Sequence, residues 1–130
     1  MNILTISAPR LLWLDCGAGA FVGITVLLFH GWLSDLFQLP ARLVFVMGMA
    51  NLAYALYSFS LALRQKRPLM LIKLLVLANF TWAVLCFTWF AAFAATASIF
   101  GLAQLGLEGL FVGGLALQEW RQRDALSSEV

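Results

Sequence analysis

Four long apolar stretches are the feature that most constrains this chain. They cover residues 11–32, 41–63, 68–91 and 97–118, and each has the roughly 20 residues that a helix needs to cross about 30 Å of hydrocarbon. The last two stretches must be separate helices, with Ser98 capping the later one, because a single helix over both would be roughly 75 Å long. We therefore expect an all-α integral membrane protein built as an antiparallel bundle of four transmembrane helices.

The composition agrees with a membrane location. Hydrophobic residues make up 63% of the chain and charged residues only 11%, whereas ordinary soluble proteins carry about 25% charged residues. So few polar side chains cannot cover a water-facing surface, which excludes a disordered chain, a basic nucleic-acid-binding protein and a secreted disulfide scaffold. Since no linker interrupts the sequence, we predict one domain over residues 1–130 that ends in a short cytoplasmic tail at 119–130.

The basic residues predict how the bundle sits in the membrane. Of the 8 Lys and Arg residues, only Arg42 falls at the end of the bundle opposite to the chain termini. Cytoplasmic connections are enriched in Lys and Arg. We therefore expect both termini to be cytoplasmic and the protein to belong to the inner membrane of a bacterium.

Two segments recur along the chain and indicate an internal duplication. The segment Gly48-Met-Ala-Asn51 resembles Gly101-Leu-Ala-Gln104, and Leu11-Leu-Trp-Leu-Asp15 is a weaker match to Leu75-Val-Leu-Ala-Asn79. Both matches fit a 2+2 repeat about an axis along the membrane normal, as some transporters have. The alternative is that helices rich in Leu, Ala and Gly resemble one another by composition alone.

A group of polar side chains falls near the middle of the predicted membrane. A charge in the middle of a membrane helix costs roughly 2.5–3.5 kcal/mol on insertion scales, so each such residue calls for an explanation. Glu108 lies near the midplane with no cation at its depth, and we expect its carboxyl to be protonated at neutral pH. The predicted ligand or proton site consists of Glu108, Asn51, Asn79, Gln104, Tyr54 and Trp82.

This polar group has two interpretations. As a functional site it predicts binding of a lipid or another small apolar or amphipathic ligand, or transport of a small molecule that is coupled to protons. Alternatively, the amides and a protonated carboxyl only hold the helices together, at about 0.6–2 kcal/mol per contact. The protein would then be a structural or accessory subunit of a membrane complex. We do not expect an enzyme, because the sequence offers no arrangement of a nucleophile and a base.

Two further patterns predict contacts between helices. Asp15 and Lys73 have opposite charges at a similar depth, and we expect them to form an ion pair between the first and third helices. Glycines repeat four residues apart in Gly19-Ala-Phe-Val-Gly23 and Gly109-Leu-Phe-Val-Gly113, a spacing that lets helix backbones approach closely. These glycines can pack within the bundle or against a second copy, and we predict a homo-oligomer through one of the two faces.

Several chemistries lack the residues that they need. His30 is the only histidine, and Cys16 and Cys86 have no metal-binding spacing and fall toward opposite sides of the membrane. The sequence also has no glycine-rich phosphate loop. We therefore expect no metal, no cofactor, no catalytic residue and no nucleic-acid partner.

The chain resembles the small multidrug resistance transporters in length and in its number of helices. That family also has four helices and an essential carboxylate inside the membrane. In the family the carboxylate is a Glu of the first helix, whereas here the first helix carries Asp15 and the Glu is in the fourth. The resemblance therefore stops at size and helix number and does not place the chain in that family.

Overall fold

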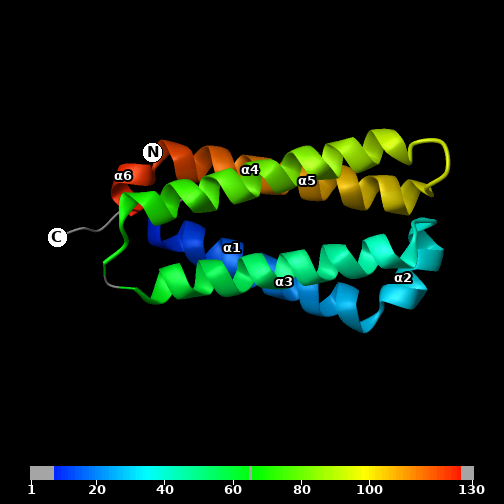
Figure 1. Ribbon diagram of the computed structural model, residues 1–130, viewed down its shortest axis with the longest axis horizontal. Helices are drawn as coiled ribbons and strands as arrows, with labels where there is room; N and C mark the ends of the chain where they lie inside the picture. Colours follow the sequence, from blue (N-terminus) through cyan, green and yellow to red (C-terminus); the bar gives the residue numbers. More distant parts are fainter. Residues whose placement is uncertain (1–7, 65, 127–130) are drawn as a thin grey trace.

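Long helices form almost all of the structure, a computed structural model that describes residues 8–64 and 66–126 (Figure 1). In chain order the elements are α1 (Ala8–Leu28), α2 (His30–Phe37), α3 (Ala41–Leu63), α4 (Leu69–Ala92), α5 (Ile99–Arg121) and α6 (Arg123–Leu126). Four of them, α1, α3, α4 and α5, are long and apolar enough to cross a membrane. This confirms the prediction of an all-helical chain with four helices that could span a membrane.

The helix boundaries follow from local chemistry. Pro40 and Pro68 directly precede α3 and α4, where a missing backbone N–H costs nothing and the fixed φ favours the helix. Ser98 Oγ accepts a hydrogen bond from Gly101 N at 3.2 Å and caps α5, as expected. The first predicted helix, 11–32, is wrong at its end. Phe29 leaves the helical conformation, with φ −117° and ψ 22°, and the chain continues in the separate short helix α2.

The long helices form two pairs, in which α1 packs along α3 and α4 packs along α5 (Figure 1). In the first pair, a Cβ added at Gly23 would lie only 2.8 Å from the backbone nitrogen of Leu52. In the second pair, a Cβ at Gly109 would lie 3.0 Å from the Phe87 ring. Contacts between the pairs are much sparser, and we call this boundary the seam.

The repeated glycines thus serve packing within each pair. Gly19 faces Asn51 and Ala55 of α3, and Gly113 faces Ala83 of α4. The predicted homo-oligomer through Gly19/Gly23 or Gly109/Gly113 must therefore be corrected, because helices of the same chain already occupy both faces. Oligomerisation through another surface stays a prediction.

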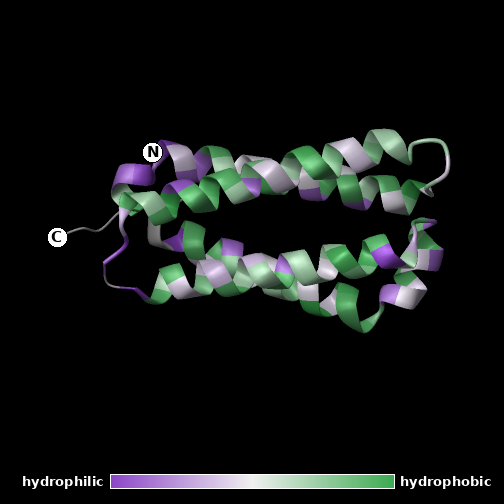
Figure 2. Ribbon diagram, viewed as in Figure 1, coloured by the Kyte–Doolittle hydropathy of each residue, from purple (hydrophilic) through white to green (hydrophobic). Residues whose placement is uncertain are grey.

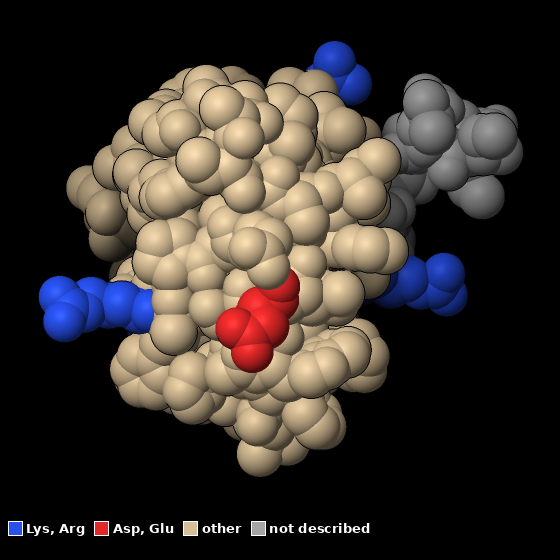
Figure 3. Space-filling model, turned by 90° about the vertical axis from the view of Figure 1, so that its right-hand side faces the viewer, with Lys and Arg blue, Asp and Glu red and all other residues tan. Residues whose placement is uncertain are grey.

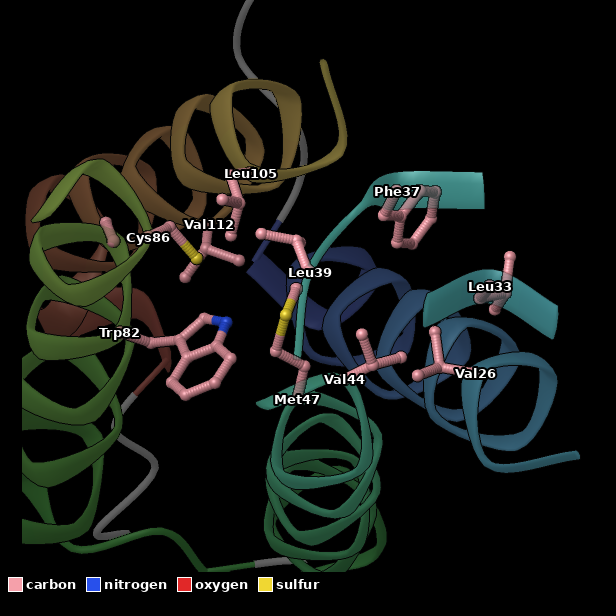
Figure 4. Packing of buried hydrophobic residues seen from close by; sticks show 11 residues of the cluster. Val26, Leu33, Phe37, Leu39, Val44, Met47, Trp82, Cys86, Leu105 and Val112 are labelled. Carbon is pink, nitrogen blue, oxygen red and sulfur yellow. The ribbon is translucent and has the colours of Figure 1, made fainter. Parts of the chain in front are cut away.

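Two apolar layers close the seam toward its two ends. The layer nearer α2, which we call the α2-side layer, includes Trp82 of α4 pointing across toward Met47 of α3 (Figure 4). The terminal layer lies near the chain ends and consists of Leu11, Leu12, Leu61, Ile72, Leu75, Leu115 and Leu126. Both layers take side chains from both helix pairs, so they join the pairs by burying apolar surface.

The outer surface suits a lipid environment. Large apolar side chains point outward, among them Phe21 at 72% and Ile99 at 78% exposed. The more hydrophilic residues gather toward the two ends of the bundle, although some also lie within it (Figure 2). At the α2 end most of the surface is uncharged, with acidic atoms near its centre and basic side chains at the edges of the view (Figure 3). The exposed residues Arg64 and Lys66 lie at the opposite end, on the connection between α3 and α4.

Candidate functional site

The first polar cluster forms around Glu108 of α5. Asn51 Nδ2 of α3 donates to Glu108 Oε1 at 2.6 Å and to its own helix at Met47 O at 2.8 Å. The Cys86 thiol of α4 lies 3.9 Å from Glu108 Oε2. Asn51 and Glu108 are 6% and 9% exposed. The structure thus brings Glu108 and Asn51 together across the seam, and the Met47 carbonyl fixes the direction of the donating amide.

Aromatic residues flank this cluster on the side of α3 and α4. The Trp82 indole lies beside the Glu108 carboxyl, although its buried Nε1 does not reach hydrogen-bond geometry with any partner. Its ring meets Tyr54 edge-on at a centroid distance of 5.9 Å and Trp89 at 5.4 Å. Gln104, one turn before Glu108, also lies beside the carboxyl. Trp82 and Gln104 therefore lie beside Glu108, and Tyr54 lines the same cavity and contacts Trp82.

Asn79 belongs to a second cluster, which corrects its predicted place beside Glu108. Its Nδ2 donates to Asp15 Oδ2 of α1 at 2.9 Å and to Glu119 Oε1 of α5 at 2.7 Å. The two carboxyl oxygens meet at one nitrogen, so they lie no farther apart than the sum of these distances. Asp15, Asn79 and Glu119 are 5%, 2% and 0% exposed, and Glu119 Oε2 is buried with no hydrogen-bond partner.

The predicted ion pair between Asp15 and Lys73 does not form in the structure. Asp15 is buried against Asn79, whereas Lys73 is exposed. Lys73 precedes Asn79 by six residues, which rotates it by about 120° around α4 relative to that amide. Lys73 therefore points away from the seam.

Glu119 is a buried site residue, although the predicted tail at 119–130 includes it. In the structure α5 continues to Arg121, and Glu119 is inside the bundle. The missing signal was helical spacing. Glu119 follows Glu108 by eleven residues, about three turns or roughly 16 Å along the same face of the helix. The two carboxyls therefore face the seam at different depths.

A cavity of about 200 Å³ lies in the seam between the two clusters. At about 30 Å³ per molecule it has room for roughly six waters. Its wall comes from α1, α3, α4 and α5, and the apolar lining includes Val22, Leu107 and Phe111. The polar residues that line it are Asp15, Asn51, Tyr54, Asn79, Gln104 and Glu108.

The cavity is equipped for hydrogen bonding and proton exchange. It presents carboxyl and amide groups, and no Lys, Arg or His is among the described residues that line it. Within residues 8–64 and 66–126 no group of three or more His, Cys, Asp or Glu side chains could hold a metal ion, and both Cys16 and Cys86 are free thiols. Comparisons with protein-family models, with curated proteins and with solved structures find no match to this chain.

Proposed function

We propose that the protein binds a small ligand in the seam cavity and couples the binding or movement of that ligand to protonation of Glu108. The observation that carries this proposal is the position of the cavity. It lies where the Asn51–Glu108 bond and the Asn79–Asp15 bond cross between the two helix pairs. A ligand or a proton that changes these bonds acts directly on the contact between the pairs.

The physical basis of the coupling is the cost of a buried charge. Ionised Glu108 receives a hydrogen bond from Asn51 but has no cation among the described residues that line the cavity. Taking up a proton removes this unbalanced charge, and so does a cationic ligand group. The groups that face the Glu108 carboxyl from the neighbouring helices are Asn51 of α3 and Trp82 and Cys86 of α4. Proton and ligand therefore compete for the same carboxyl.

The contacts across the seam support a 2+2 internal repeat. Asp15 and Asn79 occupy matching positions in the two halves of the sequence, and they hydrogen-bond to each other. Asn51 and Gln104 also match, and both lie beside Glu108. Equivalent residues meet in this way around a two-fold axis along the membrane normal. The helix α2 has no counterpart in the second half, whose helices are joined by a short connection.

The distribution of charge supports the proposed orientation. Arg64 and Lys66 lie on the connection between α3 and α4, at the end that also holds the start of α1, whereas Arg42 lies at the start of α3. With the positive end in the cytoplasm, both termini face the cytoplasm of a bacterium, and the protein lies in its inner membrane. One chain supplies both sides of the cavity, so the proposed site needs no residue from a second copy.

Electrical recordings on proteoliposomes test the proposal. The chain is reconstituted on a solid-supported membrane and exposed to an amine, a carboxylic acid and a sugar, each with and without a pH gradient. We expect one class to give a current that depends on the gradient, and Glu108→Gln to reduce it at least tenfold. Asp35→Asn, at an exposed position of α2, is the matched control. No current with any class, or an unchanged current in Glu108→Gln, contradicts the proposal.

The second candidate function is an accessory subunit of a membrane complex. It is favoured by an apolar groove of about 640 Å³ on the outer face of α4 and α5, lined by residues such as Phe87, Phe90 and Leu110. A groove of this kind can receive a helix of another protein. In this case Glu108→Gln has no effect, whereas Glu108→Leu loosens the bundle without loss of a specific activity. Co-purification of one partner, lost when Gly106 in the groove is changed to Trp, would support this candidate.

A further inference from the structure

The seam cavity is closed on three of its four sides. Toward the α2 end it is covered by the α2-side layer, in which Met47 and Leu105 are 1% and 0% exposed. Toward the termini it is covered by the terminal layer, in which Leu75 is 0% exposed. On the side of α3 and α4, the edge-on contact of Tyr54 with Trp82 bridges the two helices. Water at either membrane surface is therefore separated from the polar residues by packed side chains.

The fourth side, between α1 and α5, is open. Leu107 and Phe111 of α5 line the cavity and are also 66% and 43% exposed. Ala18 of α1 lines it from the opposite side and is partly exposed. Leu107 and Phe111 flank Glu108 near the middle of the 23-residue helix α5. The opening therefore faces the hydrocarbon of the membrane, not the water on either side.

The hydrogen bonds already formed restrict what can bind inside. Asn51 and Asn79 each use their amide nitrogens as donors to carboxyl oxygens of the same clusters. The Glu108 carboxyl borders the cavity, with Gln104 and Trp82 beside it and the weak donor Cys86 at 3.9 Å from Oε2. An ionised Glu108 in the cavity can therefore accept a further hydrogen bond, and no described basic residue lines the cavity to receive an anion.

We infer that the ligand is an amphipath dissolved in the membrane, with an apolar chain and a primary amine head, and that it enters sideways between α1 and α5. The head donates to Glu108, and the chain lies along Leu107 and Phe111 in the opening. This inference rests on the proposed function, because it names the ligand class of the same cavity. It adds a route of entry from the bilayer and a head group that donates hydrogen bonds.

Binding to the protein in nanodiscs tests the ligand class. Dodecylamine, dodecanoic acid and ethylamine are titrated onto loaded and empty nanodiscs, and native mass spectrometry counts the molecules bound per chain. We expect saturable binding of dodecylamine, and binding at least tenfold weaker for the other two compounds. Equal binding of ethylamine would overturn the bilayer route, and preferred binding of dodecanoic acid would overturn the amine head.

Two tryptophan variants of α1 test the opening. Ala18→Trp places a large side chain where α1 lines the cavity, and we expect it to weaken dodecylamine binding at least tenfold. Phe21→Trp introduces the same residue at a position that is 72% exposed and does not line the cavity, so its affinity should match the wild type. An unchanged affinity in Ala18→Trp would refute entry between α1 and α5. Ala18→Leu, a smaller change, replaces Ala18→Trp if that variant does not fold, with the same expected direction.

The outcome separates this inference from the proposed function. If dodecylamine does not bind but Glu108→Gln still abolishes a pH-dependent current with another solute, the ligand class is wrong and the proposed function stands. If Glu108→Gln has no effect on any current and dodecylamine does not bind, both are wrong. Saturable binding of dodecylamine to the wild type and not to Ala18→Trp supports the inference directly.

Discussion

The two carboxyl clusters on α5 share a helix face but differ in their partners. Glu108 accepts a hydrogen bond from the Asn51 amide, has Gln104 beside it, and borders the cavity with its second oxygen beside a thiol. Glu119 is fully buried and shares its amide donor, Asn79, with a second carboxyl, Asp15. Both acidic residues are glutamates on α5, so the difference comes from the partners that the neighbouring helices supply. A carboxyl that borders a cavity can exchange its proton with a ligand, whereas a carboxyl locked to a second one mainly joins the helix pairs.

The second cluster carries a physical constraint that the first one lacks. Two carboxylates that meet at one nitrogen repel each other, and each has a large cost of burial if ionised. A single proton retained by the pair removes most of this cost, as in other carboxyl pairs that share a proton. We therefore expect the Asp15–Glu119 pair to keep one proton while Glu108 exchanges its own.

Loss of the shared donor should have the largest effect on stability. Asn79→Leu leaves the Asp15 and Glu119 carboxyls without their common amide, and we expect a loss of about 3 kcal/mol in the free energy of unfolding. Unfolding of the purified protein in mixed detergent micelles, followed by circular dichroism, measures it. If Asn51→Leu destabilises the protein as much as Asn79→Leu or more, the two clusters do not differ in the way that we expect.

Asn51→Leu itself should cost less. Glu108 borders the cavity, so its carboxyl can turn to water or to Gln104 when the amide is lost. We expect a loss of about 1 kcal/mol in the free energy of unfolding in the same assay. A loss above that of Asn79→Leu would mean that the Glu108 cluster, not the Asp15–Glu119 pair, holds the helix pairs together.

Neutral substitutions at the two glutamates should separate stability from function. Glu119→Gln keeps the shape of the protonated acid and removes any repulsion with Asp15, so we expect stability to be unchanged or raised by up to about 1 kcal/mol. The gradient-dependent current should also remain. Glu108→Gln should be as stable as the wild type but without the current. Loss of the current in both variants would show that the clusters act as one proton path.

The smallest effect is expected at Lys73. Because this side chain is exposed and rotated away from Asp15, Lys73→Met should change the free energy of unfolding by less than about 0.5 kcal/mol. The double variant Asp15→Asn/Lys73→Met should behave like Asp15→Asn alone. If Lys73→Met instead recovered the stability lost in Asp15→Asn, the two side chains would have to form the ion pair that the structure does not show.

Hydropathy and spacing predicted the helices and the Glu108 cluster better than the partners of Asp15. Apolar length alone locates the four membrane helices, and counting residues along α3 and α5 places Asn51 beside Glu108. Depth says nothing about which way a side chain points around its helix, so Lys73 was paired with Asp15 although it lies on another face. Glu119 was lost because adjacent residues such as Trp120 and Arg121 are typical of a membrane interface. The end of α1 at Leu28 falls beside His30 and Gly31, which interrupt the apolar run, but the prediction of a helix over 11–32 passes through them.

The contact between α2 and α5 ties the two helix pairs at the α2 end, and at the opposite end the Tyr57 hydroxyl of α3 donates to Leu71 O of α4 at 2.8 Å. Ser98 donates through its backbone N to Phe37 O at 2.9 Å and through Oγ to Leu36 O at 2.6 Å, and a Cβ on Gly101 would collide with the Phe37 carbonyl. The two pairs are therefore tied at both ends of the bundle, and neither end is free to swing open. A change in the contact between the pairs has to take place near the middle of the seam, where the cavity lies.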